Sequence, residues 1–141
     1  MRKVMVSGKF DPPHDGHILH IVEASVLGDY LYVVTHTDEV IRKLKGKCEI
    51  PLWARMALLK GILKLYNIPG EVVVSVDTDG SSDMTLGYLA PHIYAKGGDR
   101  YPGNLPEKEI ETCKRIGCRI IYGIGDQINS SSKMEVDKKT I

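Results

Sequence analysis

The chain has 141 residues, enough to bury a hydrophobic core but too few for two ordinary domains, so we expect a single domain over residues 1–141. Its formal net charge is only +1 and its basic residues are scattered, which argues against nucleic acid as a partner. No apolar run approaches the roughly 18 residues of a membrane span. The three cysteines, Cys48, Cys113 and Cys118, form no CxxC pair, which argues against a disulfide framework and indicates a reducing cytoplasm.

Short apolar runs alternate with helical patterns along the first part of the chain. Residues 3–7 predict a strand that ends at Gly8, and apolar positions three and four apart predict a helix over residues 16–28. Residues 30–35 predict a second strand, and the polar stretch over residues 36–49 predicts a basic loop.

The pattern repeats to the end of the chain. The expected elements are a helix over 51–66, a strand over 71–76, a short helix over 86–90, a strand over 92–95, a helix from Pro106 to Gly117, a strand over 118–122 and a last helix after Asn129. Continuous apolar strands that alternate with helices are typical of a parallel sheet covered on both faces. We predict an α/β fold, a single Rossmann-like doubly wound domain with a five-stranded parallel sheet, whose ligand crevice lies beyond the carboxyl ends of the strands.

The loop after the first strand carries the sharpest motif, Gly8-Lys9-Phe10-Asp11-Pro12-Pro13-His14-Asp15-Gly16-His17. A helix N-terminus favours phosphate, and Gly16 allows close approach. His14 and His17, three residues apart, can face the same crevice and donate hydrogen bonds to phosphate oxygens. The alternatives are a metal pair, for which a third protein ligand is missing, or ordinary polar loop residues.

This segment resembles the signature GxFDxxHxGH of the HxGH-type, cytidylyltransferase-like nucleotidyltransferases. The resemblance implies transfer of AMP or CMP from ATP or CTP to a phosphorylated small molecule, with release of pyrophosphate and with Mg²⁺ carried by the nucleotide rather than by a protein metal site. It implies that His14 and His17 are catalytic and that Asp11 binds the acceptor. The nucleotide contacts implied in this loop are Gly8, Lys9, Phe10, His14, Asp15, Gly16 and His17.

Two later segments extend the resemblance. Lys96-Gly97-Gly98-Asp99-Arg100 is similar to the KGGD element of the adenylyltransferase domain of bacterial ADP-heptose synthases, of which glycerol-3-phosphate cytidylyltransferases carry a variant. This implies nucleotide contacts from Gly97 and Asp99, although an ordinary turn is the alternative. Ser130, Ser131 and Ser132 match the family's STTKI-type stretch, which implies contacts with the β and γ phosphates, and plain helix capping is the alternative.

The predicted basic loop resembles the family's TDE…KG segment, and Lys45 fits its KG pattern best. This implies a catalytic lysine over the α-phosphate, with Lys43 and Lys47 as rivals and a solvated surface loop as the alternative. Arg55, in the helix that follows, is expected to hold the acceptor phosphate.

The KGGD element favours a sugar phosphate as acceptor and ATP as nucleotide. Archaeal-type FAD synthesis from FMN, glycerol phosphate or phosphopantetheine as acceptor, and a nucleotide-binding regulator without turnover are the alternatives. The family resemblance further implies a homodimer. The low net charge and the lack of a long apolar run argue against nucleic acid and a membrane as partners.

Overall fold

The computed structural model describes residues 1–98 and 100–125. The predicted roles of Asp99 and of residues 130–132, and the predicted last helix, lie outside these residues. In chain order the elements are β1 (Lys3–Gly8), α1 (Asp15–Ser25), β2 (Tyr30–Thr35), α2 (Asp38–Lys45), α3 (Leu52–Leu65), β3 (Gly70–Val74), α4 (Asp83–Leu89), β4 (Ile93–Ala95), α5 (Glu107–Ile116) and β5 (Arg119–Ile121).

The strands form one parallel sheet in the order β3-β2-β1-β4-β5. Strand order runs outward from β1 in both directions, so the chain reverses its direction of winding between β3 and β4. In such sheets the ligand crevice lies beyond the carboxyl ends of the strands at this point. The predicted α/β fold with a five-stranded parallel sheet is confirmed.

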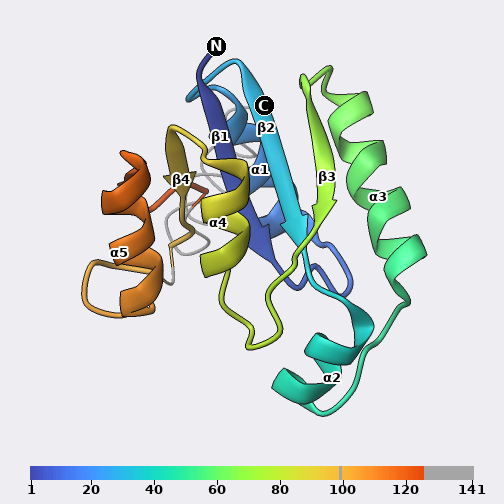
Figure 1. Ribbon diagram of the computed structural model, residues 1–141. Helices are drawn as coiled ribbons and strands as arrows, with labels where there is room; N and C mark the ends of the chain where they lie inside the picture. The colour runs from blue at the N-terminus through green and yellow to red at the C-terminus, as the bar shows by residue number, and fades with distance from the viewer. Residues whose placement is uncertain (99, 126–141) are drawn as a thin grey trace.

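Alternate side chains of the central strand face opposite helical layers. Val4 and Val6 pack with side chains of α1 and α3, whereas Met5 packs with Leu86 of α4 and Cys113 of α5. Figure 1 shows α4 and α5 in front of the sheet, α1 behind it, and α2 beyond the ends of β2 and β3. The burial of both sheet faces explains why the strands read as continuous apolar runs.

The prediction of a loop over residues 36–49 is wrong for residues 38–45, which form α2. The side chain of Thr37 accepts a hydrogen bond from the backbone N–H of Val40 at 3.3 Å and so caps the helix. Val40 and Ile41 supply the buried face, and Gly46 ends the helix at a φ of 85°. Apart from Leu44, which is exposed, the remaining residues of α2 are polar, so composition alone does not reveal this helix.

The end of one strand and the inner face of one helix also differ from the sequence prediction. Strand β3 ends at Val74 rather than residue 76, because the backbone N–H of Val76 donates to the hydroxyl of Thr85 in α4 at 3.1 Å. Helix α5 buries Glu109 and Thr112 beside Cys113, so its inner face is more polar than an apolar helical stripe.

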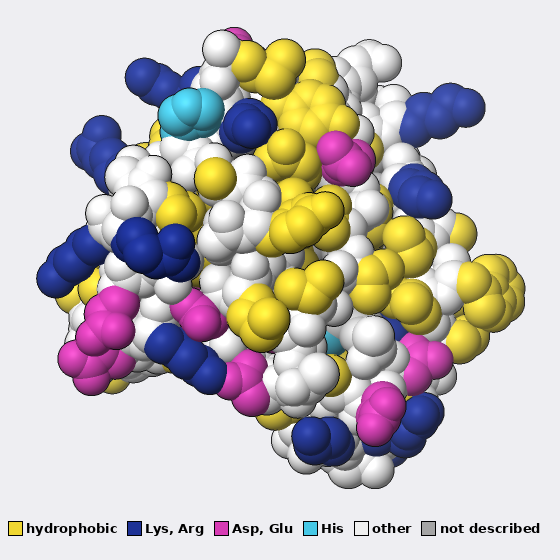
Figure 2. Space-filling model, viewed as in Figure 1, with side chains coloured by type: hydrophobic (Ala, Val, Ile, Leu, Met, Phe, Trp, Pro, Cys, Tyr) yellow, Lys and Arg dark blue, Asp and Glu magenta, His cyan; other side chains and the backbone are white. Residues whose placement is uncertain are grey.

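Large apolar side chains remain exposed on two helices. Trp53 on α3 is 75% exposed and Tyr88 on α4 is 83% exposed. Figure 2 shows a band of hydrophobic side chains down the middle of the face that carries α4. Within residues 1–98 and 100–125, no helix is both long enough and apolar enough to cross a membrane.

Gly70 begins β3 against β2, and a Cβ added there would lie 2.3 Å from the carbonyl oxygen of Leu31. We expect Gly70→Ala to lower the free energy of unfolding by about 1–3 kcal/mol, because the backbone must shift to relieve the overlap. Gly61 in α3 is the matched control, since an added Cβ meets nothing within 4 Å. Gly61→Ala should stabilise the protein by roughly 0.5–1 kcal/mol. Urea unfolding measures both, and equal stability of the two variants would contradict the prediction.

Candidate active site

A cavity of about 670 Å³ opens at the carboxyl ends of β1 and β4, a volume that suits a small-molecule site. It brings together most of the residues predicted from the sequence, namely Gly8, Lys9, Phe10, Asp11, His14, Gly16, His17, Lys45 and Gly97. Neither Asp15 nor Arg55 lines it. The predicted loop and helix start therefore converge on one hollow with the predicted lysine.

The two histidines of the motif hold the start of α1 with their Nδ1 atoms. Nδ1 of His14 accepts from the backbone N–H of Gly16 at 3.1 Å, and Nδ1 of His17 accepts from the backbone N–H of His14 at 3.2 Å. The rings stack with centroids 3.7 Å apart. Because Nδ1 is the acceptor in each ring, the proton of the neutral imidazole sits on Nε2. Each histidine can therefore present an Nε2–H donor.

The environment of His17 keeps its ring neutral. Burial lowers its pKa to about 4, and the neighbouring His14 and His20 act in the same direction. The ring also meets the edge of Phe10, with centroids 4.9 Å apart. At neutral pH, His17 is therefore a hydrogen-bond donor without a full charge.

We expect the His17 ring to titrate in an NMR experiment with a midpoint near pH 4, well below its ordinary value of 6.5. Since the folded pKa is the lower one, the unfolded imidazole takes up a proton at a pH at which the folded one does not. The unfolding free energy should therefore fall as the pH drops from 6.5 toward 4. His17→Asn assigns the signal, and a midpoint at the ordinary value would contradict the burial of this ring.

Lys45, the last residue of α2, reaches back to the motif loop. Its Nζ lies 3.1 Å from a carboxylate oxygen of Asp11 and 3.2 Å from the Asp11 carbonyl oxygen. Lys43 donates instead to the carbonyl oxygen of Thr78, and Lys47 pairs with Glu49. Of these three lysines, only Lys45 is brought to the cavity.

Asp11 is a buried carboxylate with several donors. The backbone N–H groups of Glu49 and Ile50 donate to its two oxygens at 2.7 and 2.8 Å, and Lys45 adds the ion pair. Burial by itself would raise the pKa of Asp11, but these three donors together outweigh it and hold the pKa below its usual range. Asp11 thus anchors the segment that follows α2.

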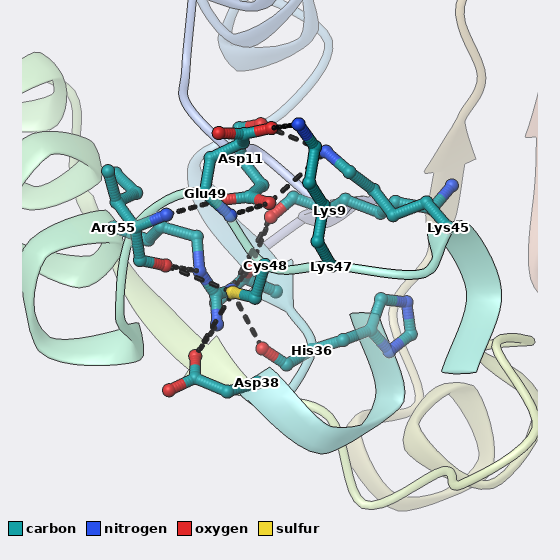
Figure 3. Close-up of polar contacts among 11 residues, drawn as sticks. Lys9, Asp11, His36, Asp38, Lys45, Lys47, Cys48, Glu49 and Arg55 are labelled. Carbon is teal, nitrogen blue, oxygen red and sulfur yellow. Dashed lines mark hydrogen bonds and ion pairs between the residues drawn. The ribbon is translucent and has the colours of Figure 1, made fainter. Parts of the chain in front are cut away.

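Arg55 is fully buried and contacts the end of β2, the residue that follows β1 and the start of α2. Its Nη1 atom donates to the hydroxyl of Thr35 and to the carbonyl oxygen of His36, both at 2.7 Å, and its Nη2 atom pairs with Asp38 at 2.6 Å. Nε donates to the carbonyl oxygen of Ile50 at 3.2 Å. Figure 3 shows this guanidinium between α3 and α2, with the imidazole of His36 pointing away from it. Acceptor binding by Arg55 stays a prediction from the sequence.

Arg55→Met should lower the free energy of unfolding by about 3 kcal/mol, because it leaves Asp38 and several buried acceptors without their donor. Lys60→Met on the same helix is the control, since Lys60 is exposed and should change stability by less than about 0.5 kcal/mol. Urea unfolding gives both values. Wild-type stability of Arg55→Met would show that the buried contacts contribute nothing.

The cavity also has lining residues that sequence reasoning did not assign: Ser7, Pro12, His20, Lys96, Gly98, Arg100 and Gly125. His20 follows His17 at helical spacing, a signal that was available in the sequence. Lys96 belongs to the KGGD element, from which only the glycine and the aspartate were singled out. Gly125 approaches from a separate turn, and nothing local in the sequence indicates this.

The described residues offer no site for a resident metal ion. Over residues 1–98 and 100–125, no group of three or more His, Cys, Asp or Glu side chains is arranged to hold one. Both carboxylate oxygens of Asp11 already accept hydrogen bonds from backbone N–H groups. The donor set of the cavity suits an anion better than a cation.

Comparison with known proteins agrees with this geometry. The model of the family described as cytidylyltransferase-like matches residues 5–137. A bifunctional protein HldE from Actinobacillus succinogenes is 36% identical over 110 residues, which are 76% of this chain and 22% of the relative. A second HldE, from Haemophilus ducreyi, is 28% identical over 90% of this chain and 24% of its own length. The chain therefore spans less than a quarter of the length of these two curated relatives.

Solved structures with the same fold include the lipopolysaccharide core biosynthesis protein from Thermoplasma volcanium. Its TM-score is 0.65 and its identity 26%, with coverage of 87% of this chain and 94% of that one. A protein of unknown function from Archaeoglobus fulgidus has a TM-score of 0.63 at 16% identity over 85% of this chain and 87% of its own, a likeness of fold alone.

Proposed function

The chain belongs to the cytidylyltransferase-like family, and on that premise we propose that it transfers AMP or CMP from a nucleoside triphosphate to a phosphorylated small molecule. A phosphate oxygen of the acceptor attacks the α-phosphorus, the bond to the β-phosphate oxygen breaks, and pyrophosphate leaves. The observation that carries this proposal is the paired capping of α1, which leaves the Nε2–H groups of two cavity-lining histidines as donors.

His14 and His17 stabilise the charge that develops on the leaving pyrophosphate. Donors fixed in advance are the main contribution that a protein makes to such a transfer. To neutralise the α-phosphate, the Lys45 ammonium either breaks its ion pair with Asp11 or keeps that pair and contacts the phosphate as well. The predicted nucleotide contacts of Asp99 and of residues 130–132 belong to this proposal as expectations from the family resemblance.

Magnesium enters with the nucleotide as part of the substrate. The described cavity residues do not fit a protein-held Mg²⁺, because they lack a cluster of carboxylates. The protein's own cations and imidazoles therefore act on phosphate oxygens that the metal does not cover.

We propose ATP as the nucleotide and a sugar phosphate as the acceptor. The KGGD element supports this choice, and so does the 36% identity to a protein HldE. The alternatives are FMN as acceptor, as in an archaeal-type FAD synthase, and a nucleotide-binding regulator without turnover. Yellow colour after purification would favour the first, and nucleotide binding without pyrophosphate release would favour the second.

We also propose a homodimer that works in the cytoplasm. Exposed apolar side chains, such as Trp53 on α3 on one face of the sheet and Tyr88 on α4 on the other, support packing of a second copy on one of these faces. The three cysteines are free thiols, which agrees with a reducing compartment.

The test is pyrophosphate release with Mg²⁺ and either ATP or CTP, against sugar 1-phosphates, glycerol 3-phosphate, FMN and phosphopantetheine. We expect release with ATP that depends on one sugar phosphate. His14→Asn should lower kcat by roughly 10²–10³-fold, because asparagine keeps the helix cap but lacks the Nε2–H donor. Lys45→Ala should also lower kcat, whereas the exposed Lys64→Gln should not.

Full turnover by His14→Asn and His17→Asn, with a matched acceptor, would show that the imidazole donors have no such role. Release that does not depend on any acceptor would indicate hydrolysis of the nucleotide and would overturn the transfer reaction.

A further inference from the structure

A lysine lies almost buried at the edge of the cavity. Lys96 follows β4, lines the hollow, and is only 7% exposed. Its Nζ donates to the hydroxyl of Tyr94 at 3.1 Å and stands 4.5 Å from the centre of the Tyr94 ring. A buried ammonium is costly unless it is paired, so the position of Lys96 depends on the contacts that hold it there.

The hydroxyl of Tyr94 has its hydrogen-bonding capacity filled. It donates its proton to Glu109 at 2.8 Å and accepts from Lys96. Since its one proton is used, the contact of 3.1 Å with the Ser7 hydroxyl has Ser7 as donor. Burial raises the pKa of Tyr94, and the charge of Glu109 raises it further, so the proton stays in place. The ring is thereby fixed beneath the lysine.

Glu109 of α5, which accepts the hydrogen bond from Tyr94, is the third member of this network. It is 3% exposed, and its second oxygen accepts the backbone N–H of Ser82 at 2.8 Å. The Tyr94 hydroxyl links this buried carboxylate to Lys96. The hydrogen bonds among Lys96, Tyr94 and Glu109 therefore fix the position of the Lys96 side chain at the cavity.

Lys96 and the histidines lie on opposite sides of the sheet edge. Met5 and Tyr94 pack with α4 and α5, and Ser7, two residues after Met5, reaches the Tyr94 hydroxyl on that side. His14 and His17 begin α1, which packs on the other face. In an in-line displacement the attacking oxygen approaches opposite the leaving group. If pyrophosphate leaves toward the histidines, the acceptor enters from the side of Lys96.

We propose that Lys96 binds the phosphate group of the acceptor and that Tyr94 and Glu109 are positioning residues that hold it there, an inference that rests on the proposed function. An ammonium has three N–H donors, so it can hold Tyr94 and a phosphate together. The site then selects phosphate monoesters over neutral alcohols. Arg55, whose guanidinium contacts the interior, holds the fold around α2.

The test uses the full chain with Mg²⁺ and α,β-methylene-ATP, which cannot release pyrophosphate, and titrates inorganic phosphate by calorimetry. We expect Lys96→Gln to weaken phosphate binding by about tenfold or more, the loss of a charge-assisted hydrogen bond. Tyr94→Phe keeps the charge but removes the bridge and should weaken binding by a smaller factor. Affinity for the nucleotide analogue should stay within about twofold of wild type in each variant, and the exposed Lys60→Gln should match wild type throughout.

A second variant covers failure to fold, because Lys96→Gln changes one charged member of a buried network and leaves the other, Glu109, in place. Lys96→Met combined with Glu109→Gln removes both charges together, which a buried network tolerates better. It should fold, bind the nucleotide analogue and lose phosphate binding. Lys96→Arg restores the cation and should recover part of the affinity.

Three results would overturn the assignment: wild-type phosphate affinity in the Lys96 variants, an equal loss of nucleotide affinity, or no phosphate binding by the wild-type protein. The titration needs no turnover. Phosphate binding that depends on Lys96, in a protein that releases no pyrophosphate with any acceptor, would support the assignment and overturn the proposed function alone.

Discussion

The buried guanidinium of Arg55 is the contact on which the arrangement of the site depends. Its donors join the end of β2 to Asp38 at the start of α2, and to Ile50 just before α3. The Asp11 carboxylate then holds the same connecting segment from the other direction. With both ends of this segment fixed, α2 can deliver Lys45 to the cavity.

Two polar networks of different kinds flank the sheet edge. On the α1 side, backbone groups and imidazoles form a short-range cap in which His14 and His17 take part within one helical turn. On the α4 side, Tyr94 and Glu109 link β4 to α5 over a long range, deep in the interior. The proposed reaction runs between them, with the leaving group at the local network and the acceptor at the distant one.

The sequence predicted those features of the fold and site that depend on local patterns of residues. The α/β fold followed from apolar strands between helices, and the hollow around His14 and His17 followed from a compact motif next to a predicted strand. It missed α2, whose single buried turn is hidden by polar residues, and it could not foresee that Arg55 is buried. That burial depends on acceptors from three separate segments, which no local pattern connects. Lys96 belongs to a motif that the sequence analysis identified. Its proposed role depends on Glu109, which lies in a helix whose sequence pattern is amphipathic.

The capping of α1 by His14 and His17 also bears on the energetics of ligand binding. Rings that are held by backbone N–H groups and stacked on each other have already lost their rotational freedom when the protein folds. A nucleotide that enters the cavity therefore meets preorganised donors and need not order them. The entropic cost of ordering these two side chains therefore arises on folding rather than on binding. The hydrogen bonds that start α1 offset that cost.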